Sequence, residues 1–296
     1  MKKDISVIIL SYNTKDLTLQ CIEKLQKSLA KGILKSEIIV VENNSHDGSV
    51  EALKHVSEMH PNVKIIYNTD NCGFGKANNQ GLIISKGRYI LYLNSDVFVP
   101  NEPFLDELIK EMDLHILIGA LTARVQLASG ALDPASHRGF PTVWRSFCYY
   151  TGLERLTTHI PYLNRVFGGY HLTHLSLSTK HEIDAPTGAF FLARKDILDV
   201  LHGFDENFFM YGEDIDLAFR IKRLGYSIIY DPTFTVLHFK NQSGIKRKND
   251  TTIQKKTRKY FYESMTIFYK KHYEKVYPRF ISQFVYLAIN QKKESS

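Results

Sequence analysis

Residues 89–99 read YILYLNSDVFV: five apolar or aromatic residues, a polar turn, and three more apolar residues. The first part, 89–93, predicts a strand in the core, and Asp96 follows it within three residues. A buried strand that ends in a carboxylate indicates either a helix cap or a ligand site at the edge of a sheet. The segments on either side decide what kind of sheet this strand belongs to.

Strand-like and helix-like segments alternate through the first hundred residues. Apolar runs at 6–12, 37–44, 63–68 and 88–94 predict strands, and the segments at 16–29, 47–59 and 75–86 between them predict helices. Strands separated by single helices indicate βαβ units and a mainly parallel sheet with helices on both faces. The sequence therefore predicts an α/β fold.

Each of these four strands ends in short polar side chains. The polar ends lie at 11–13, 42–45, 68–71 and 94–96. Asn, Asp and Ser favour turns and helix caps, so one such end needs no further explanation. Four of them at the carboxyl edge of one sheet, where ligands bind in open α/β folds, favour a polar crevice.

A second acidic cluster lies in the segment GEDIDL, residues 212–217. It places Glu213, Asp214 and Asp216 at the start of a helix predicted for about 214–224 and closed by Gly225. Carboxylates are stabilised at helix amino termini, so a purely structural explanation exists. The aromatic run at 208–211 favours instead an acid–base site beside a sugar-sized pocket, where a carboxylate takes a proton from an attacking hydroxyl.

The positive charge of the chain is concentrated in its last fifth. Residues 240–296 hold 14 Lys and Arg against 4 Asp and Glu, whereas residues 1–239 hold 24 against 27. A basic tail favours an anionic partner, either a lipid surface or a diphosphate ligand. No nucleic-acid-binding motif accompanies it, so we expect no nucleic-acid partner.

The tail divides into two parts. Residues 245–259, IKRKNDTTIQKKTRK, predict a mobile loop or linker, and residues 260–275 predict an amphipathic helix with an aromatic stripe. One interpretation is a solvated loop and a helix packed on the catalytic domain. The other is peripheral contact with anionic lipid.

The sequence predicts neither export nor a membrane span. The first apolar run, 5–10, is short and lacks a cleavage site, and no stretch approaches the roughly 18–20 apolar residues of a span. The three cysteines share no metal-ligand spacing, which is typical of reduced thiols. We expect a cytoplasmic protein, with peripheral contact to the inner face of the membrane as a further hypothesis.

Seven motifs run in order from Val7 to Gly244: VIILSYNTKDL, VVENNSHDGSVEAL, NCGFGKANNQGL, YILYLNSDVFV, PTGAFFLARKDIL, GFDENFFMYGEDIDLAFRIKRLGY and VLHFKNQSG. Together they resemble family 2 glycosyltransferases, nearest to bacterial rhamnosyltransferase-type enzymes. The resemblance implies the GT-A fold, a Rossmann-like mixed, mainly parallel sheet flanked by helices. It implies a catalytic domain over residues 1–240, with residues 241–296 as a basic loop and C-terminal amphipathic helical extension.

The resemblance also implies residue roles. Asp214 stands where the catalytic base is expected, with Glu213 beside it, and a divalent cation, Mg²⁺ or Mn²⁺, is expected at Asp96 and His238. Residues implied to line the sugar or acceptor pocket are Thr187, Gly188 and Tyr211. Residues implied to bind the nucleotide sugar are Ser11, Tyr12, Asn13, Glu42, Asn43, Gly73, Phe74, Gly75, Asn78, Asn94, Ser95 and Asp96.

Two positions depart from the family pattern. Asn94 replaces the first Asp of the acidic motif, which leaves one carboxylate for the cation, and Glu42 stands where Asp is common. The implied reaction is an inverting single displacement from a dTDP- or UDP-sugar, with rhamnose favoured. The implied acceptor is a bacterial surface glycan, either lipid-linked or a free oligosaccharide.

Two other functions remain open from the sequence. A nucleotidyltransferase acting on sugar phosphates also places acidic residues around Mg²⁺ on an α/β sheet, but it usually needs a glycine-rich phosphate loop after its first strand. The turn here is SYNTKDL, without glycine. A catalytically inactive, glycan-binding GT-A domain would use the same aromatic residues, although the presence of Asp96, Asp214 and His238 together argues against it.

Overall fold

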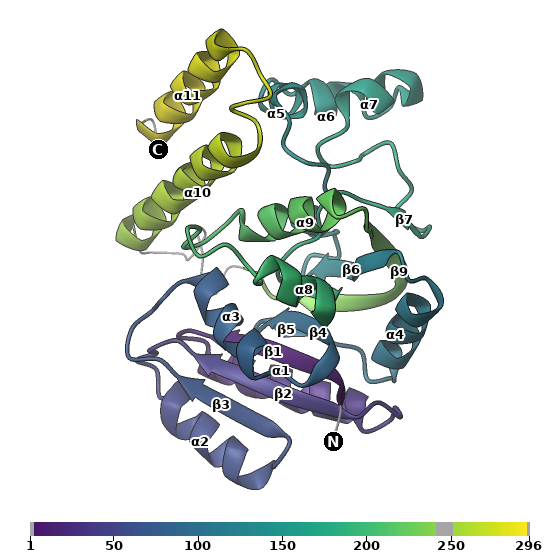
Figure 1. Cartoon of the computed structure of the whole chain (residues 1–296), viewed down its shortest axis with the longest axis vertical. Helices are drawn as coiled ribbons and strands as arrows, with labels where there is room; N and C mark the ends of the chain where they lie inside the picture. Colours follow the sequence, from purple (N-terminus) through teal and green to yellow (C-terminus); the bar gives the residue numbers. More distant parts are fainter. Residues whose placement is uncertain (1–2, 241–250, 295–296) are drawn as a thin grey trace.

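The computed structural model describes residues 3–240 and 251–294 and contains one mixed β-sheet (Figure 1). The strands lie in the order β3-β2-β1-β4-β8-β6-β9-β5, and β7 pairs with β9. Their bounds are β1 (Lys3–Ser11), β2 (Ser36–Glu42), β3 (Val63–Tyr67), β4 (Gly87–Asn94), β5 (Val97–Phe98), β6 (Ile118–Leu127), β7 (His181–Glu182), β8 (Phe190–Arg194) and β9 (Ser227–His238).

The predicted α/β architecture is confirmed. Strands β1 to β4 are parallel neighbours, and β6 is parallel to β9. Strand β8 runs antiparallel between β4 and β6, and the short strands β5 and β7 are antiparallel to β9. The sheet is therefore mainly parallel, as the alternating sequence pattern predicts, and mixed, as the family resemblance implies.

Eleven α-helices lie in the described part of the chain. They are α1 (Lys15–Leu29), α2 (Ser49–Met59), α3 (Phe74–Ile84), α4 (Phe104–Leu114), α5 (Val143–Tyr150), α6 (Leu153–Thr157), α7 (Pro161–Phe167), α8 (Lys195–Leu201), α9 (Glu213–Arg223), α10 (Thr251–His272) and α11 (Arg279–Glu294). A 3₁₀ turn, η1, spans Pro134–Ser136. Helices α5 to α7 lie at the end of the molecule opposite α2 and β3 (Figure 1).

Both faces of the sheet are buried, and each face has its own apolar core. Alternate residues of β1 show this, because Val7 belongs to one core and Ile8 to the other. The first core contains residues of α1 and α4, and the second contains residues of α3, α8, α9 and α10. Helices on both faces explain why the strands read as continuous apolar runs.

Helix α10 shares the second core with α3, α8 and α9. Phe268 and Tyr269 of α10, and Tyr273 directly after it, are each less than 9% exposed and belong to that core. The predicted mobile loop at 245–259 is wrong for residues 251–259, because these form the first turns of α10; residues 245–250 lie outside the described part. The segment 251–272 contains no Gly or Pro, and docking of its aromatic residues supplies the tertiary support that a helix needs.

Neither α10 nor any other helix within residues 3–240 and 251–294 is long and apolar enough to cross a membrane.

Candidate active site

The loops that follow β1, β2 and β4 contact one another at the carboxyl edge of the sheet. Asn13 joins two of them, because its backbone N–H donates to Ser45 Oγ at 2.9 Å and its side-chain oxygen accepts from the His46 N–H at 2.8 Å. The hydroxyls of Thr14 and Ser95 lie 2.9 Å apart. The polar strand ends of the sequence therefore meet in one place, as the parallel order requires.

Several side chains implied to bind the nucleotide sugar are engaged by the protein. Glu42 is 1% exposed and accepts hydrogen bonds from the N–H groups of its own turn, residues 44 and 45. Asn43 Oδ1 accepts from Asn68 Nδ2 at 3.0 Å and from the Cys72 N–H at 3.2 Å. The buried hydroxyl of Ser11 lies 3.1 Å from that of Thr18. These side chains shape the loops, and their contacts with a nucleotide remain predictions.

The glycine-rich turn at 73–75 packs on the loop that leads into α9. Gly73 has φ +88°, and a Cβ at this position would lie 2.5 Å from the backbone oxygen of Phe209. The Phe74 N–H donates to that same oxygen at 2.8 Å. A Cβ at Gly75 would lie 3.1 Å from Phe204 Cβ. The close approach of two backbones explains both glycines.

The same turn brings the predicted sugar pocket next to the predicted base. A Cβ at Gly188 would lie 3.1 Å from the Phe74 ring and 3.6 Å from Asp214 Cβ. Asn78 is buried and donates to the Phe74 backbone oxygen at 3.0 Å. Thr187 is 6% exposed, and Tyr211 has φ +70° just before α9. The implied nucleotide, sugar and base residues therefore come from adjacent segments.

Strand pairing brings Asp96 and His238 together. Val97 of β5 is in register with His238 of β9, and His238 Nε2 lies 3.3 Å from Asp96 Oδ1. His238 Nδ1 lies 2.8 Å from Asp133 Oδ2, and Lys240 Nζ lies 2.8 Å from Asp133 Oδ1. Burial opposes the charge of the imidazole, but its hydrogen bonds to Asp133 and Asp96 raise the pKa of His238 to about 9.

Asp96 and His238 could supply two ligands to a divalent cation, provided that His238 loses a proton. The raised pKa means that the imidazole is protonated in the absence of a cation, with Nε2 beside Asp96, so a cation would have to displace that proton. Both oxygens of Asp133 already have partners, and a carboxylate on the far nitrogen of the imidazole is common for metal-binding histidines because it orients the ring. No cluster of three or more His, Cys, Asp or Glu in the described residues could hold a metal. Substrate oxygens would have to supply the remaining ligands.

Asp214 lies in the first turn of α9, where it is paired with a buried arginine. Asp214 Oδ2 accepts from Arg138 Nη2 at 2.7 Å and from the Gly188 N–H at 3.1 Å, and Oδ1 accepts from the Ile215 N–H at 2.8 Å. The guanidinium of Arg138 also donates to the Pro186 backbone oxygen at 2.7 Å. These three donors fix the orientation of the Asp214 carboxylate, the group predicted to act as the general base.

Glu213, beside Asp214, has the opposite environment. The residue is 6% exposed, and its Oε2 has no hydrogen-bond partner among the described residues. Burial, with the neighbouring Asp214 charge second, raises the pKa of Glu213 to about 8. Of the two adjacent carboxyl groups, Glu213 therefore favours its protonated form near neutral pH.

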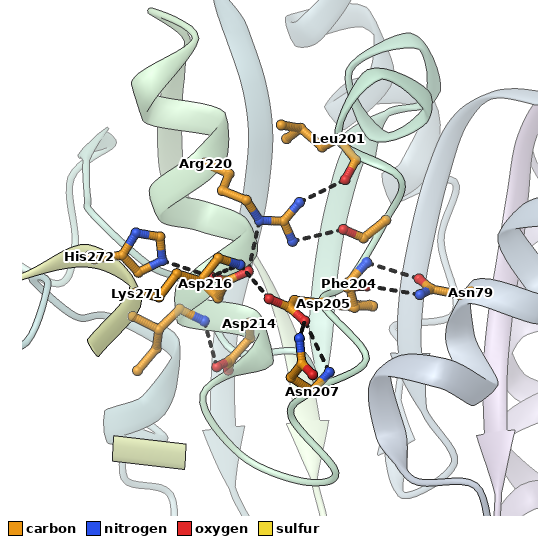
Figure 2. Close-up of polar contacts among 12 residues, drawn as sticks. Asn79, Leu201, Phe204, Asp205, Asn207, Asp214, Asp216, Arg220, Lys271 and His272 are labelled. Atoms are coloured by element: carbon orange, nitrogen blue, oxygen red, sulfur yellow. Dashed lines mark hydrogen bonds and ion pairs between the residues drawn. The ribbon is translucent and has the colours of Figure 1, made fainter. Parts of the chain in front are cut away.

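Asp216, the third carboxylate of the cluster, points away from Asp214 toward the C-terminal helix. Its side chain is fully buried, and it contacts Arg220, Lys271 and His272, each at 2.7 Å (Figure 2). Although burial opposes its charge, the hydrogen bond from His272 and the charges of Arg220 and Lys271 hold the pKa of Asp216 below its usual value. The idea that all three carboxylates form one acid–base site is therefore wrong for Asp216.

Sequence reasoning missed Asp133 and Arg138, which lie in the irregular segment after β6. Asp133 precedes Pro134 and accepts from the Ala135 N–H at 3.1 Å, so its only sequence signal is that of a turn. No motif marks Arg138. Both residues contact predicted site residues through the fold alone.

Comparison with known proteins identifies the family. The model of "Glycosyl transferase family 2" matches residues 6–199. An N-acetylglucosaminyl-diphospho-decaprenol L-rhamnosyltransferase of Mycobacterium tuberculosis is 28% identical over 235 residues, which are 74% of this chain and 73% of the relative. Rhamnosyltransferase WbbL of Escherichia coli is 28% identical over 174 residues, covering 56% of this chain and 61% of the relative.

Solved structures support the fold. The mannosyltransferase PcManGT of Pyrobaculum calidifontis, in complex with GDP-Man and Mn²⁺, aligns with a TM-score of 0.59 at 17% identity, over 99% of this chain and 73% of that chain. This likeness shows a shared GT-A architecture. The matched family model, the curated relatives and the fold agree: the chain belongs to glycosyl transferase family 2 and is an enzyme of the glycosyltransferase class.

Proposed function

We propose that the protein transfers a sugar, with rhamnose favoured, from a nucleoside-diphosphate donor to a hydroxyl of a bacterial surface glycan, with inversion at the anomeric carbon. The observation that carries the proposal is the placement of Asp214. Its carboxylate accepts a hydrogen bond from the Gly188 N–H, and Gly188 lies close to the ring of Phe74 in the Gly73–Gly75 turn, so the predicted base adjoins segments implied to hold the sugar and the nucleotide.

Asp214, Arg138 and Glu213 have different roles in the proposed reaction. Asp214 accepts the proton of the acceptor hydroxyl, and that oxygen forms a bond to the anomeric carbon while the bond from this carbon to the diphosphate oxygen breaks with its electron pair. Arg138 donates to Asp214 and so orients its carboxylate. Glu213, protonated at neutral pH, adds no second negative charge at this point.

Asp96 and His238 are the residues that would hold a divalent cation, Mg²⁺ or Mn²⁺. Bound there, such a cation neutralises negative charge on the leaving diphosphate. Asp133 and Lys240 contribute by orienting His238 and balancing the buried charge around it. With Asn94 in the acidic motif, Asp96 is the one carboxylate of that motif available to a cation.

The donor and acceptor are proposed from the relatives. Both the mycobacterial and the Escherichia coli relative are named rhamnosyltransferases, which supports a deoxysugar donor on dTDP or UDP. The name of the mycobacterial relative specifies a diphospho-decaprenol acceptor, which supports a lipid-linked glycan here as well. A cytoplasmic enzyme that reaches such an acceptor at the inner face of the membrane fits the basic residues 240–296.

Contact of the basic tail with anionic lipid is part of this proposal. Lys246, Arg247 and Lys248 lie outside the described residues, but Lys255, Lys256 and Lys259 lie exposed on the first turns of α10. Each basic residue near an anionic membrane contributes about 1 kcal/mol to binding. The triple variant with Gln at 255, 256 and 259 is expected to co-sediment less with phosphatidylserine vesicles in low salt. Equal sedimentation with neutral vesicles would contradict lipid contact.

A panel of nucleotide sugars tests the donor. A bound donor raises the melting temperature by mass action, so dTDP-rhamnose with Mn²⁺ is expected to give the largest shift. Slow release of nucleoside diphosphate from that donor would separate an active transferase from an inactive glycan-binding domain. A shift with another sugar and none with dTDP-rhamnose would overturn the choice of rhamnose.

A further inference from the structure

The end of α10 contacts α9 two residues from Asp214. Lys271 Nζ and His272 Nε2 each lie 2.7 Å from the same atom, Asp216 Oδ1. His272 and Asp216 are 56 residues apart in the chain. Figure 2 shows these side chains converging on Asp216 from the C-terminal helix while Arg220 approaches from α9 itself.

The burial of Asp216 makes these contacts necessary. Its side chain is fully buried, and an unpaired buried carboxylate is strongly destabilising. Of its three side-chain partners, only Arg220 belongs to the same helix; Lys271 and His272 belong to α10. The first turn of α9 therefore depends on α10 for its charge balance.

The same charged groups fix the segment that precedes α9. Lys271 Nζ also lies 2.5 Å from Asp205 Oδ2, so one ammonium group bridges this segment and α9. Arg220 donates to the backbone oxygens of Leu201 at 2.9 Å and Gly203 at 2.8 Å. The segment 201–205 is thus tied to α9 from both sides (Figure 2).

The rest of the loop, up to Gly212, lies between the glycine-rich turn and α10. The backbone oxygen of Phe209 accepts from the Phe74 N–H, and the Phe209 ring stacks on Tyr260 of α10 with centroids 4.5 Å apart. A Cβ at Gly212 would lie 3.3 Å from Ser264, also in α10. Helix α10 therefore contacts the loop that delivers Asp214.

We propose that Lys271 is a positioning residue for glycosyl transfer. Lys271 joins Asp205 to Asp216 and so fixes the first turn of α9 relative to the loop 201–212. The position of the Asp214 carboxylate, which lies in that turn, depends on this contact. Helix α10 is then part of the catalytic unit. The inference rests on the proposed role of Asp214 as the base, because Lys271 acts on the reaction through that residue.

A lysine pair on α10 gives a matched test. Lys271→Met removes the bridge, and Lys270→Met changes an exposed neighbour on the same helix. Misplacing a catalytic group by about 1 Å costs on the order of 100-fold in rate, so Lys271→Met is expected to lower kcat about 10- to 100-fold. The KM for the donor should change less than about twofold. Lys271→Arg, which keeps the charge, should recover most of kcat, and Lys270→Met should match the wild type.

A second measurement does not depend on activity. Hydrogen exchange of the amides in residues 204–216 is expected to accelerate in Lys271→Met and to stay unchanged in Lys270→Met, with UDP affinity the same in both. If the wild type transferred no sugar from any donor, the proposed function would fail, while the exchange data would still decide whether Lys271 orders this loop.

Two results would overturn the inference. Lys271→Met with full kcat in its folded fraction would reduce the contact to a stabilising one, and a donor KM that rises as much as kcat/KM falls would assign Lys271 to donor binding. Should Lys271→Met fail to fold, Asp205→Asn takes its place, because it removes the loop end of the bridge and leaves Asp216 paired. The same kinetic and exchange changes are expected from it, at smaller size.

Discussion

Asp96 and Asp214 are both predicted to act in the same site, but different kinds of contact hold the two carboxylates in place. Asp96 faces His238 because β5 and β9 pair in a fixed register. Asp214 is held by Arg138, which comes from an irregular segment 76 residues away. Strand pairing therefore positions Asp96, whereas side-chain contacts between distant segments position Asp214. Changes at Asp214 should therefore disturb catalysis and stability together, and changes at Asp96 should mainly affect cation and donor binding.

The largest effect is expected from Asp214→Asn. It keeps the size of the side chain but removes the base, and a general base contributes about 10²- to 10⁴-fold to a rate. We expect a loss of that order in kcat, with the donor dissociation constant nearly unchanged by calorimetry. Asp196→Asn, in the first turn of α8 and exposed, is the control. An equal loss of donor affinity would mean that Asp214 holds the donor instead.

Arg138→Met tests whether the buried ion pair between Arg138 and Asp214 also stabilises the folded protein. The two side chains are 10% and 12% exposed, and breaking a buried ion pair from one side costs about 3–5 kcal/mol. Urea unfolding should show a loss of this size in the free energy of unfolding. Arg88→Met breaks an ion pair with Asp113 whose side chains are 39% and 43% exposed, so at most about 1 kcal/mol should be lost there. Similar losses in the two variants would contradict the buried pair.

Asp133→Asn tests the predicted cation site at Asp96 and His238. The substitution removes the carboxylate that orients the His238 ring. Loss of a residue that holds a metal-binding histidine in this way typically lowers metal affinity about 10- to 100-fold. We expect that decrease for Mn²⁺ in the presence of UDP, and Asp96→Ala should lower both Mn²⁺-dependent donor binding and turnover. Activity that survives chelation would contradict the cation site and leave cationic side chains to balance the leaving group.

The surroundings of Asp96 are easier to predict from the sequence than those of Asp214, for a physical reason. Polar residues after parallel strands meet at one edge whatever their side chains do, so the ends of β1, β2 and β4 could be placed from strand order alone. The juxtaposition of Asp96 and His238 came from the family resemblance. The register between β5 and β9 explains it in the structure.

The remainder depended on tertiary contacts without a local signal. Arg138 and Asp133 lie in a segment with no periodic pattern, and Asp216 could not be told apart from Asp214 by spacing. The charge of residues 245–259 predicts a loop, but residues 251–259 form the first turns of α10. Docking of the aromatic residues that follow stabilises these turns. Burial against a partner that is distant in sequence decided each of these cases.

The effect expected at Glu213 depends on pH, and its sign is diagnostic. The folded protein raises the pKa of this carboxyl from an ordinary value of about 4.5 to about 8, so between these pH values the native state holds a proton that the unfolded chain has released. Stability therefore falls as pH rises through this window, and it stays at the lower level above it. Glu213→Gln cannot ionise and escapes that loss. Its melting temperature should match the wild type at pH 4.5 and exceed it at pH 8.5, whereas the exposed Glu107→Gln should show no such pH-dependent difference. A Glu213→Gln melting temperature that does not exceed that of the wild type at pH 8.5 would mean that the fold does not raise the pKa of Glu213.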